Sequence, residues 1–234
     1  MRGFDPRQPS PPGVVSAGSD ADAVTGADLV LSLNSAHDAV PAFTAAADAL
    51  RPTAIWADLN TASPAVKQRL AELGRERAIA VTDIAMMAPV PGLGLRVPML
   101  ASGDAADQVA DALRGYGASI EVLDGPAGLA ATRKLLRSVF YKGMAASIVE
   151  ALEAARAGGL EDWLRPHIAD ELAKADASTV DRIVTGTQRH AVRRRHEMAA
   201  AAEMVADLGV RPIMADASRA LHERLAGEDP TSAG

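Results

Sequence analysis

A lysine, a serine and a tyrosine share one face of a predicted helix in the middle of the chain. Lys134, Ser138 and Tyr141 stand at positions i, i+4 and i+7 of an Ala- and Leu-rich stretch that follows a Gly/Pro turn at 125–128. An amine on such a helix, facing a ligand-binding edge, would be partly removed from water, and neighbouring arginines would further disfavour its charged form. Both effects favour acid–base chemistry at Lys134. A solvated lysine on an amphipathic helix fits the same pattern.

Small polar side chains follow two of the apolar runs in the first half of the chain. Asn34 and Ser35 follow the run at 29–33, and Asn60 and Thr61 follow the run at 54–58. Such groups at the end of a strand can hydrogen-bond the ribose or carboxamide of a cofactor. They are equally common as helix caps and turn formers, so their spacing leaves both interpretations open.

Strand and helix patterns alternate up to residue 124, and helical periodicity alone follows. Strands are predicted at 29–33, 54–58, 79–83, 98–102 and 119–123, with helices at 38–50, 64–74 and 104–114. This alternation predicts an open parallel sheet with helices on its faces. Further helices are predicted at 128–157, 162–174, 178–209 and 212–225. The Pro- and Gly-rich residues 6–19 are predicted to form a loop.

The composition excludes several classes of protein. A net charge of -6 argues against a nucleic-acid-binding surface or attachment to an anionic membrane, since either needs a basic surface. The chain has no cysteine, which excludes disulfides and thiolate metal sites, and its histidines show no metal-ligand grouping. No apolar run is long enough for a membrane span or a signal peptide. We therefore expect a cytoplasmic protein without a metal.

Three motifs stand in order along the first 140 residues. They are Asp58-Leu-Asn-Thr-Ala-Ser-Pro64, Asp83-Ile-Ala-Met-Met-Ala-Pro89, and Gly125-Pro-Ala-Gly128 followed by Lys134. In this order they resemble the β-hydroxyacid dehydrogenase family, which includes 3-hydroxyisobutyrate and 6-phosphogluconate dehydrogenases and has imine reductases as relatives. The C-terminal part, with its basic stretch at 189–198, resembles a helical domain fused to phosphogluconate-dehydrogenase-type NAD-binding domains. The resemblance covers nearly the whole chain and implies a Rossmann-like α/β domain followed by an all-α domain.

The resemblance implies a role for individual residues. Lys134 matches the family's catalytic lysine, which polarises or protonates the substrate oxygen during hydride transfer, and Ser138 replaces the family's asparagine four residues later. Met87 and Ala88 stand where the family has a Ser-Gly-Gly substrate loop, which points to a less polar substrate. The residues expected to meet the cofactor, which is NAD or NADP, are Asn34, Ser35, Asn60 and Thr61. Tyr141 and Arg194 complete the candidate substrate site, although the basic cluster around Arg194 also fits a solvated helix face or a dimer contact.

The resemblance also implies a glycine-rich pyrophosphate loop about 20 residues before the acidic residue that meets the ribose. Residues 3–6 resemble the end of the family's second strand, with Asp5 as that acidic residue and Arg7 as a partner for a 2′-phosphate. The glycine-rich loop is then expected before residue 1, so the sheet is expected to lack its first strand and helix. The expected domains are an incomplete Rossmann-type NAD(P)-binding domain at 1–124, an all-α domain at 125–226 and a disordered tail at 227–234.

Two functions follow from these features. The first is an NAD(P)-dependent oxidoreductase that acts on a small hydroxy-acid-like or related substrate, with Lys134 as general acid/base, in a homodimer. The second is a cofactor-deficient remnant that serves as a helical dimerisation or ligand-binding module. The sequence favours the first and leaves the substrate unnamed.

Overall fold

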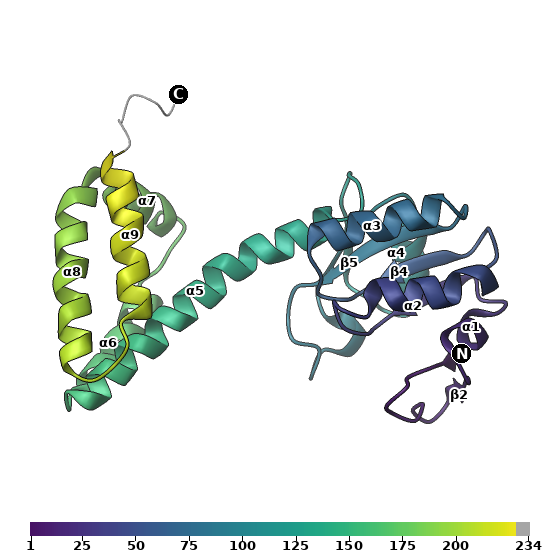
Figure 1. Ribbon diagram of the computed structural model, residues 1–234, viewed down its shortest axis with the longest axis horizontal. Coiled ribbons are helices and arrows are strands. Elements are labelled where there is room, and N and C mark those ends of the chain that lie inside the picture. The colour runs from purple at the N-terminus through teal and green to yellow at the C-terminus, as the bar shows by residue number, and fades with distance from the viewer. Residues whose placement is uncertain (228–234) are drawn as a thin grey trace. The chain divides into compact units, whose positions relative to one another are not determined.

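The computed structural model describes residues 1–227. Its first unit, Met1–Ser138, is built on a five-stranded sheet (Figure 1). The strand order is β3-β4-β5-β6-β7, which follows the order along the chain. The strands are β3 (Leu29–Ser32), β4 (Ile55–Asp58), β5 (Ala80–Met86), β6 (Met99–Ser102) and β7 (Ile120–Val122), and the helices between them are α2 (Ala39–Ala46), α3 (Pro64–Arg75) and α4 (Ala106–Arg114). All five predicted strands and the three predicted helices are confirmed.

One strand corrects the prediction of a parallel sheet. The pairs β3–β4, β4–β5 and β6–β7 are parallel, but β6 runs antiparallel to β5. The parallel pairs are joined through helices, whereas β5 returns to β6 through a loop that holds only a short 3₁₀ turn at Gly94–Arg96. Without a crossover helix the chain can enter the neighbouring strand only from the same end.

The N-terminal residues form a separate small sheet. β1 (Arg2–Gly3) pairs in parallel with β2 (Val15–Ser16), and α1 (Asp20–Val24) follows. Residues 3–6 were predicted to end a strand of the Rossmann-type sheet, but Gly3 belongs to this separate two-stranded sheet. Neither β2 nor α1 was predicted. Both elements are short, and a two-residue strand has no hydrophobic alternation to detect.

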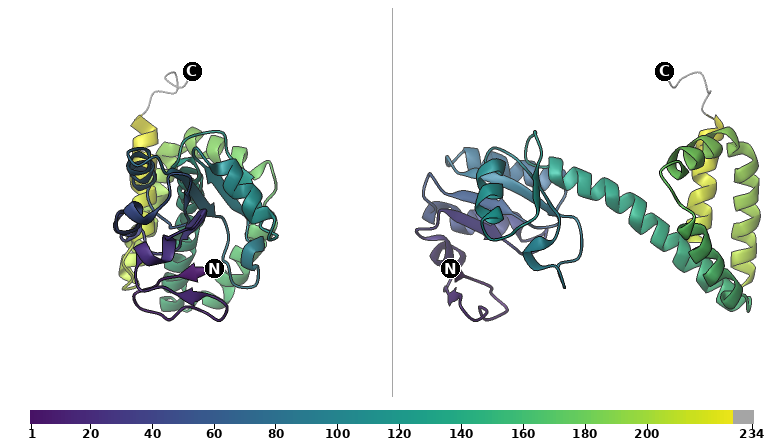
Figure 2. Two further views of the ribbon diagram at one scale, coloured as in Figure 1. Left: turned by 90° about the vertical axis from the view of Figure 1, so that its right-hand side faces the viewer. Right: turned by 180° about the vertical axis from the view of Figure 1, so that it is seen from behind.

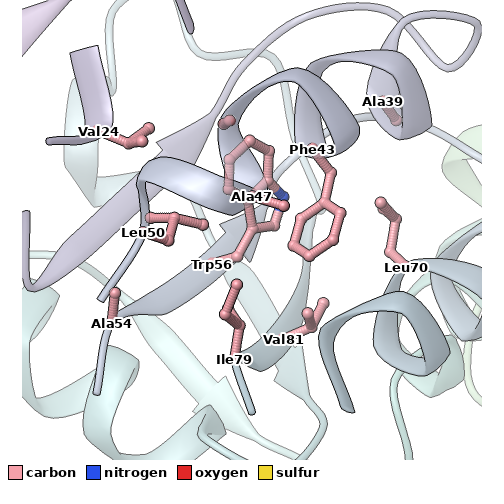
Figure 3. Packing of buried hydrophobic residues seen from close by; sticks show 11 residues of the cluster. Val24, Ala39, Phe43, Ala47, Leu50, Ala54, Trp56, Leu70, Ile79 and Val81 are labelled. Atoms are coloured by element: carbon pink, nitrogen blue, oxygen red, sulfur yellow. The ribbon is translucent and has the colours of Figure 1, made fainter. Parts of the chain in front are cut away.

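Helices lie on both faces of the five-stranded sheet (Figure 2), and an apolar cluster packs on each face. Trp56 on β4 points to one face, where it meets Phe43 of α2 edge-on at 5.2 Å between ring centroids (Figure 3). The next residue, Ala57, points to the other face and packs under Val109 of α4. This alternation follows from the two-residue period of a strand. A third apolar cluster lies where β5 and β6 meet the start of α5 (Leu129–Ala157).

The predicted role of Gly74 is wrong. It was expected to end its helix, but it lies inside α3, and the space beside it is closed by β5. A Cβ atom at Gly74 would lie 2.5 Å from the carbonyl oxygen of Ile79 and 2.6 Å from a methyl group of Val81. Glycine is therefore required at this position by the close approach of α3 to the sheet.

The second unit begins at Val139 and is helical. The division falls inside α5 (Leu129–Ala157), which starts one residue later than predicted. The other helices are α6 (Glu161–Ala173), α7 (Thr179–Arg189), α8 (Ala191–Asp207) and α9 (Ile213–Gly227). Within this unit, α8 and α9 lie side by side, and α7 contacts both (Figures 1 and 2).

Two details of the helical unit differ from the prediction. The helix expected at 178–209 is broken at His190, where the backbone leaves the helical region before α8 begins. Gly227, assigned to a tail, is the last residue of α9, and the rest of that tail lies outside the described residues. Across 1–227, no helix combines the length and apolarity that crossing a membrane requires.

A buried carboxylate joins two helices of this unit. Glu150 on α5 accepts hydrogen bonds from the backbone N–H groups of Met214 and Ala215, at 2.6 and 2.8 Å. These groups belong to the first turn of α9, where N–H groups have no partner within their own helix. The negative charge also suits the positive end of the α9 dipole.

Substitution of Gly74 tests the packing of α3 on the sheet. We expect Gly74→Ala to lower the free energy of unfolding by about 1–3 kcal/mol, because the added methyl group meets backbone that must shift. The matched control is Gly143→Ala in α5, where a Cβ would enter open space. That change should be neutral or stabilise by up to about 1 kcal/mol. Equal effects of the two changes in urea unfolding would contradict the packing argument.

The corner between α5 and α6 supplies a pH test. Glu161 accepts hydrogen bonds from Arg156 and Arg165, and these bonds lower the pKa of its carboxyl group from 4.5 to about 2. A carboxyl group whose pKa is lower in the folded than in the unfolded protein stabilises the fold. This stabilisation is complete above the pKa of the unfolded state and is lost as the pH falls from about 4.5 toward 2. A carboxyl ¹³C titration of Glu161 should show this midpoint. In Glu161→Gln the urea midpoint of unfolding should fall less between about pH 4.5 and 2 than in the wild-type protein. An unchanged pH dependence would show that Glu161 does not contribute to it.

Candidate functional site

The candidate site is built at the carboxyl ends of β3 and β4. In register across the parallel pair β4–β5, Asp58 stands beside Asp83. Both carboxylates are buried, and like charges placed opposite each other on neighbouring strands repel. A counter-charge is therefore required between them.

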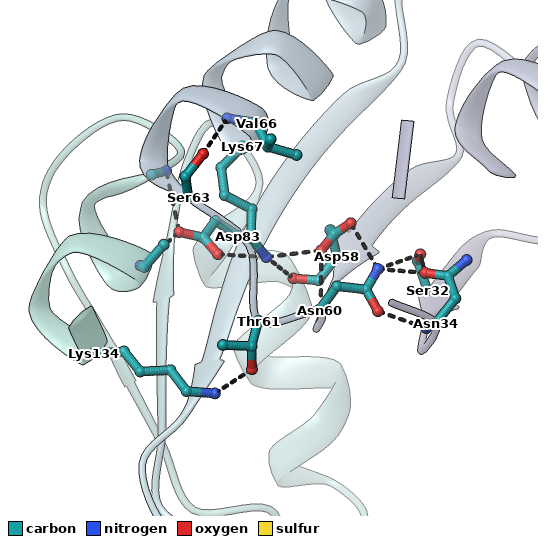
Figure 4. A network of polar contacts seen from close by, with 12 residues as sticks. Ser32, Asn34, Asp58, Asn60, Thr61, Ser63, Val66, Lys67, Asp83 and Lys134 are labelled. Carbon is teal, nitrogen blue, oxygen red and sulfur yellow. Dashed lines mark hydrogen bonds and ion pairs between the residues drawn. The ribbon is translucent and has the colours of Figure 1, made fainter. Parts of the chain in front are cut away.

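Lys67 supplies this charge from α3. Its Nζ atom lies 2.7 Å from Asp58 Oδ1 and 2.9 Å from Asp83 Oδ1, and it also donates to the backbone oxygen of Asp58 (Figure 4). The Lys67 side chain is 1% exposed. A buried ion group of this kind is tolerated only where hydrogen bonds satisfy the remaining polar atoms.

The other oxygen of Asp83 holds the start of α5. Asp83 Oδ2 accepts from the backbone N–H groups of Gly128 and Ala131, at 3.1 and 2.9 Å. Gly128 has a φ of +101°, and a Cβ there would lie 3.0 Å from the backbone oxygen of Pro64. Glycine thus permits both the left-handed conformation and the close approach of α5 to α3.

Asn60 links the loop after β4 to the loop after β3. Its Nδ2 group lies within hydrogen-bond distance of Asp58, Ser32 and Asn34, and its Oδ1 atom accepts from the backbone N–H of Asn34. Asn60 is buried, while Asn34 is exposed at the end of the strand. The two predicted asparagines are therefore brought together, and the buried Asn60 side chain holds the two loops by its hydrogen bonds.

Thr61 and Lys134 form the contact that unites the predicted site. Lys134 Nζ donates a hydrogen bond of 2.8 Å to Thr61 Oγ1, although 73 residues separate them. Thr61 is exposed and Lys134 is half-buried. An ammonium and a hydroxyl group thus meet at the sheet edge where open α/β proteins bind ligands.

Other predicted residues lie in local turns or loops. Asp5 Oδ1 accepts from the backbone N–H groups of Arg7 and Gln8, in the turn that follows β1. Ser35 Oγ donates to Asp38 at the start of α2. The described contacts do not connect these residues to the Thr61–Lys134 pair, so their roles stay predictions.

The predicted substrate residues are divided between the two units. Met87 packs on the cluster that includes Ala130 of α5, and Ala88 packs on the α4 side of the sheet. Ser138 is half-buried on α5 and belongs to the first unit. Tyr141 and Arg194 belong to the second unit, where Arg194 donates to Thr187 of α7. Their roles in a substrate site stay predictions.

Sequence reasoning missed Lys67, although a signal was present. Lys67, Leu70 and Gly74 are spaced i, i+3 and i+7, which places them on the same face of α3. All three are buried. A lysine on the apolar face of a helix beside two strands that end in aspartate indicates a buried ion pair. Among the described residues, no group of histidine, aspartate and glutamate side chains is arranged to hold a metal ion.

Comparison with known proteins agrees with this architecture. Residues 155–225 match the model of a domain of unknown function, DUF1932. An uncharacterised 28.5 kDa protein of Methanothermus fervidus is 28% identical over 160 residues, which are 68% of this chain and 61% of that protein. The chain therefore spans less than two thirds of the length of this curated relative.

Two solved structures are similar to this chain. One is a conserved protein of unknown function, described as structurally similar to 3-hydroxyacid dehydrogenases. It is 27% identical, with a TM-score of 0.56 and coverage of 91% of this chain and 80% of that one. The other is an imine reductase from Myxococcus stipitatus in complex with NADP⁺. It is 18% identical, with a TM-score of 0.72 and coverage of 92% and 80%. The chain thus has the Rossmann-like fold of 3-hydroxyacid dehydrogenase-like proteins and imine reductases, followed by a helical region that matches DUF1932, and the resemblance read from its motifs is confirmed at the level of the fold.

Proposed function

We propose that the protein is an NAD(P)-dependent oxidoreductase of the β-hydroxyacid dehydrogenase type, with Lys134 as general acid/base. The observation that carries the proposal is the 2.8 Å hydrogen bond from Lys134 Nζ to Thr61 Oγ1 at the carboxyl end of β4. Solved structures of the same fold include an imine reductase with NADP⁺ and a reductive aminase of Aspergillus terreus with NADPH. The substrate we propose is a small hydroxy-acid-like compound or a related carbonyl or imine.

The polar groups at the strand ends fit the nicotinamide end of such a cofactor. Thr61 presents an exposed hydroxyl beside the Asn34–Asn60 bridge, at the edge of two parallel strands. Hydroxyl and amide groups there are suited to a ribose or a carboxamide. The 234 residues contain no Gly-x-Gly-x-x-Gly run, so the fit concerns this end of the cofactor alone.

The side chains of the proposed site account for the proton transfer, and the cofactor accounts for the hydride transfer. When bound, the cofactor supplies or accepts the hydride. Lys134 Nζ donates to Thr61 Oγ1, so this hydroxyl fixes where the ammonium lies. An ammonium held there can donate a proton to a substrate oxygen or nitrogen as negative charge develops, and the neutral amine can take it back in the reverse direction.

The loop after β5 supports a substrate of low polarity. In this loop Val90, Leu93 and Leu95 are exposed, and residues 87–95 contain no charged side chain. Arg96, which is also exposed, is the one charged residue of the loop. A free carboxylate on the substrate would gain no ion pair from residues 87–95, and Arg96 is the one residue of this loop that could provide one. We therefore include uncharged carbonyl compounds and cyclic imines in the proposed substrate range.

A cofactor titration and a lysine substitution test the proposal together. NADPH or NADH should raise the melting temperature and quench protein fluorescence, and turnover should appear with a panel of 3-hydroxy acids or cyclic imines. Lys134→Ala should lower kcat by about 10²–10⁴-fold, because it removes the proton donor, while cofactor affinity is retained. The matched control is Lys142→Ala, which changes an exposed lysine further along α5.

Two results would contradict parts of this proposal. Full turnover in Lys134→Ala would remove Lys134 from the mechanism. Absence of binding by NADPH and NADH at millimolar concentration would instead favour a helical dimerisation or ligand-binding module that lacks cofactor chemistry.

A homodimer is the proposed assembly, and the apolar surface of the second unit supports it. Val180, Ile183 and Val184 are exposed on one face of α7. An open apolar groove of about 260 Å³ lies between α5 and α6, lined in part by Ile148 and Leu172. Exposed apolar faces of this kind are typical of subunit contacts.

Light scattering tests the assembly. The chain should elute with the mass of a dimer, and Ile183→Asp should shift it toward the monomer because a charge would be buried in the contact. Thr185→Asp, which places the same charge on another face of α7, is the control and should leave the mass unchanged. A monomeric wild-type protein at micromolar concentration would reject the dimer.

A further inference from the structure

Lys67 lies near the proposed catalytic pair but is closed off from any ligand. With a side chain 1% exposed, it cannot touch substrate or cofactor. Among residues 1–227 its ammonium contacts Asp58 and Asp83, and both of these residues also hold other parts of the site. Its role must therefore act through these two carboxylates.

Asp58 binds the segment that carries Thr61, and Asp83 binds the segment that carries Lys134. Asp58 receives the backbone N–H and the Nδ2 group of Asn60, at 3.0 and 3.1 Å, and Asn60 is followed directly by Thr61. Asp83 receives the backbone N–H of Ala131, and Lys134 lies three residues further along α5. The two halves of the pair are thus tied to one ammonium.

These contacts form a closed ring. It runs from Thr61 through Asn60 and Asp58 to Lys67, then through Asp83 and the first turn of α5 to Lys134, and the Lys134–Thr61 hydrogen bond closes it (Figure 4). We propose that Lys67 is a positioning residue, which sets the place of the Lys134 amine by holding the loop at 59–61 and the start of α5 in one arrangement. The catalytic part of this inference rests on the proposed function.

The chemistry of the ring explains why a charge is used. Asp58 and Asp83 are paired in register on parallel strands, so the sheet holds the two carboxylates close together. An ammonium attracts both carboxylates, whereas an apolar side chain would fill the volume and leave them to repel each other. Buried ion groups add little net stability compared with apolar packing, so a role in fixing geometry is the better account of this one.

The four lysines of the chain permit a direct measurement of the Lys134 amine. They are Lys67, Lys134, Lys142 and Lys174. Reductive methylation with ¹³C-formaldehyde labels accessible amines, so Lys67 stays unlabelled in the folded protein. Lys134→Arg identifies the Lys134 signal in the ¹³C spectrum, and Thr61→Val shows where that signal lies when its hydroxyl partner is absent.

The main test variant is Lys67→Met combined with Asp58→Asn, which removes one positive and one negative charge together. The second is Asp58→Asn alone, an isosteric change that leaves Lys67 paired with Asp83 and is the less disruptive to folding. In both variants the Lys134 signal should move toward its position in Thr61→Val, while the Lys142 and Lys174 signals stay in place. Lys174→Met, which removes an exposed lysine paired with Glu171, is the control and should leave the Lys134 signal unmoved.

Kinetics supply the second readout. In the variants that fold, kcat should fall by at least 10-fold, because positioning of the amine is lost. A folded variant with the Lys134 signal at its wild-type position would overturn the inference, whatever its activity. If the signal moves but the wild-type protein shows no oxidoreductase activity, the positioning role stands and the proposed function fails.

Discussion

The ion group of Lys67, Asp58 and Asp83 is the interaction on which the first unit depends. It connects α3, β4 and β5 directly, and through Asp83 it connects α5 as well. Its geometry is constrained from every side. The two carboxylates are held in register by the sheet, and the ammonium reaches them from a helix that packs closely on β5 because Gly74 has no side chain. The absence of a side chain at Gly74 and the position of the Lys67 ammonium are therefore linked through the packing of α3 on the sheet.

Helix ends in both units are satisfied by carboxylates from other elements. Asp83 of β5 accepts from the first turn of α5, and Glu150 of α5 accepts from the first turn of α9. The first N–H groups of a helix require partners, and a buried acid provides both hydrogen bonds and a charge of the favourable sign. These bonds join residues far apart in the sequence, so they fix where each helix begins relative to its neighbour.

The candidate site inherits its position from this framework. Parallel strands place the loops after β3 and β4 at one edge, and the asparagine bridge holds the two loops together. The capped start of α5 brings a lysine to the same edge. An amine, a hydroxyl and an amide bridge are then gathered at the strand ends where open α/β sheets bind ligands, and this arrangement supports the oxidoreductase that we propose.

Local patterns were enough to predict most of the secondary structure. The apolar runs that became β3 to β7 and the helical periodicity of α2 to α4 are properties of neighbouring residues, and the motifs around Asn60 and Lys134 identified the fold. The direction of β6 and the presence of β2 and α1 were not predicted, because a strand's direction depends on its connection and very short elements carry no periodicity.

By itself, then, the sequence determined the order of strands and helices, the change to an all-helical region and the residue types available for chemistry. Only the tertiary structure decided that Lys67 is buried between two aspartates and that Lys134 reaches Thr61. The reason is physical. Periodicity reports which face of an element is apolar, whereas contacts between side chains 73 residues apart depend on how whole elements pack.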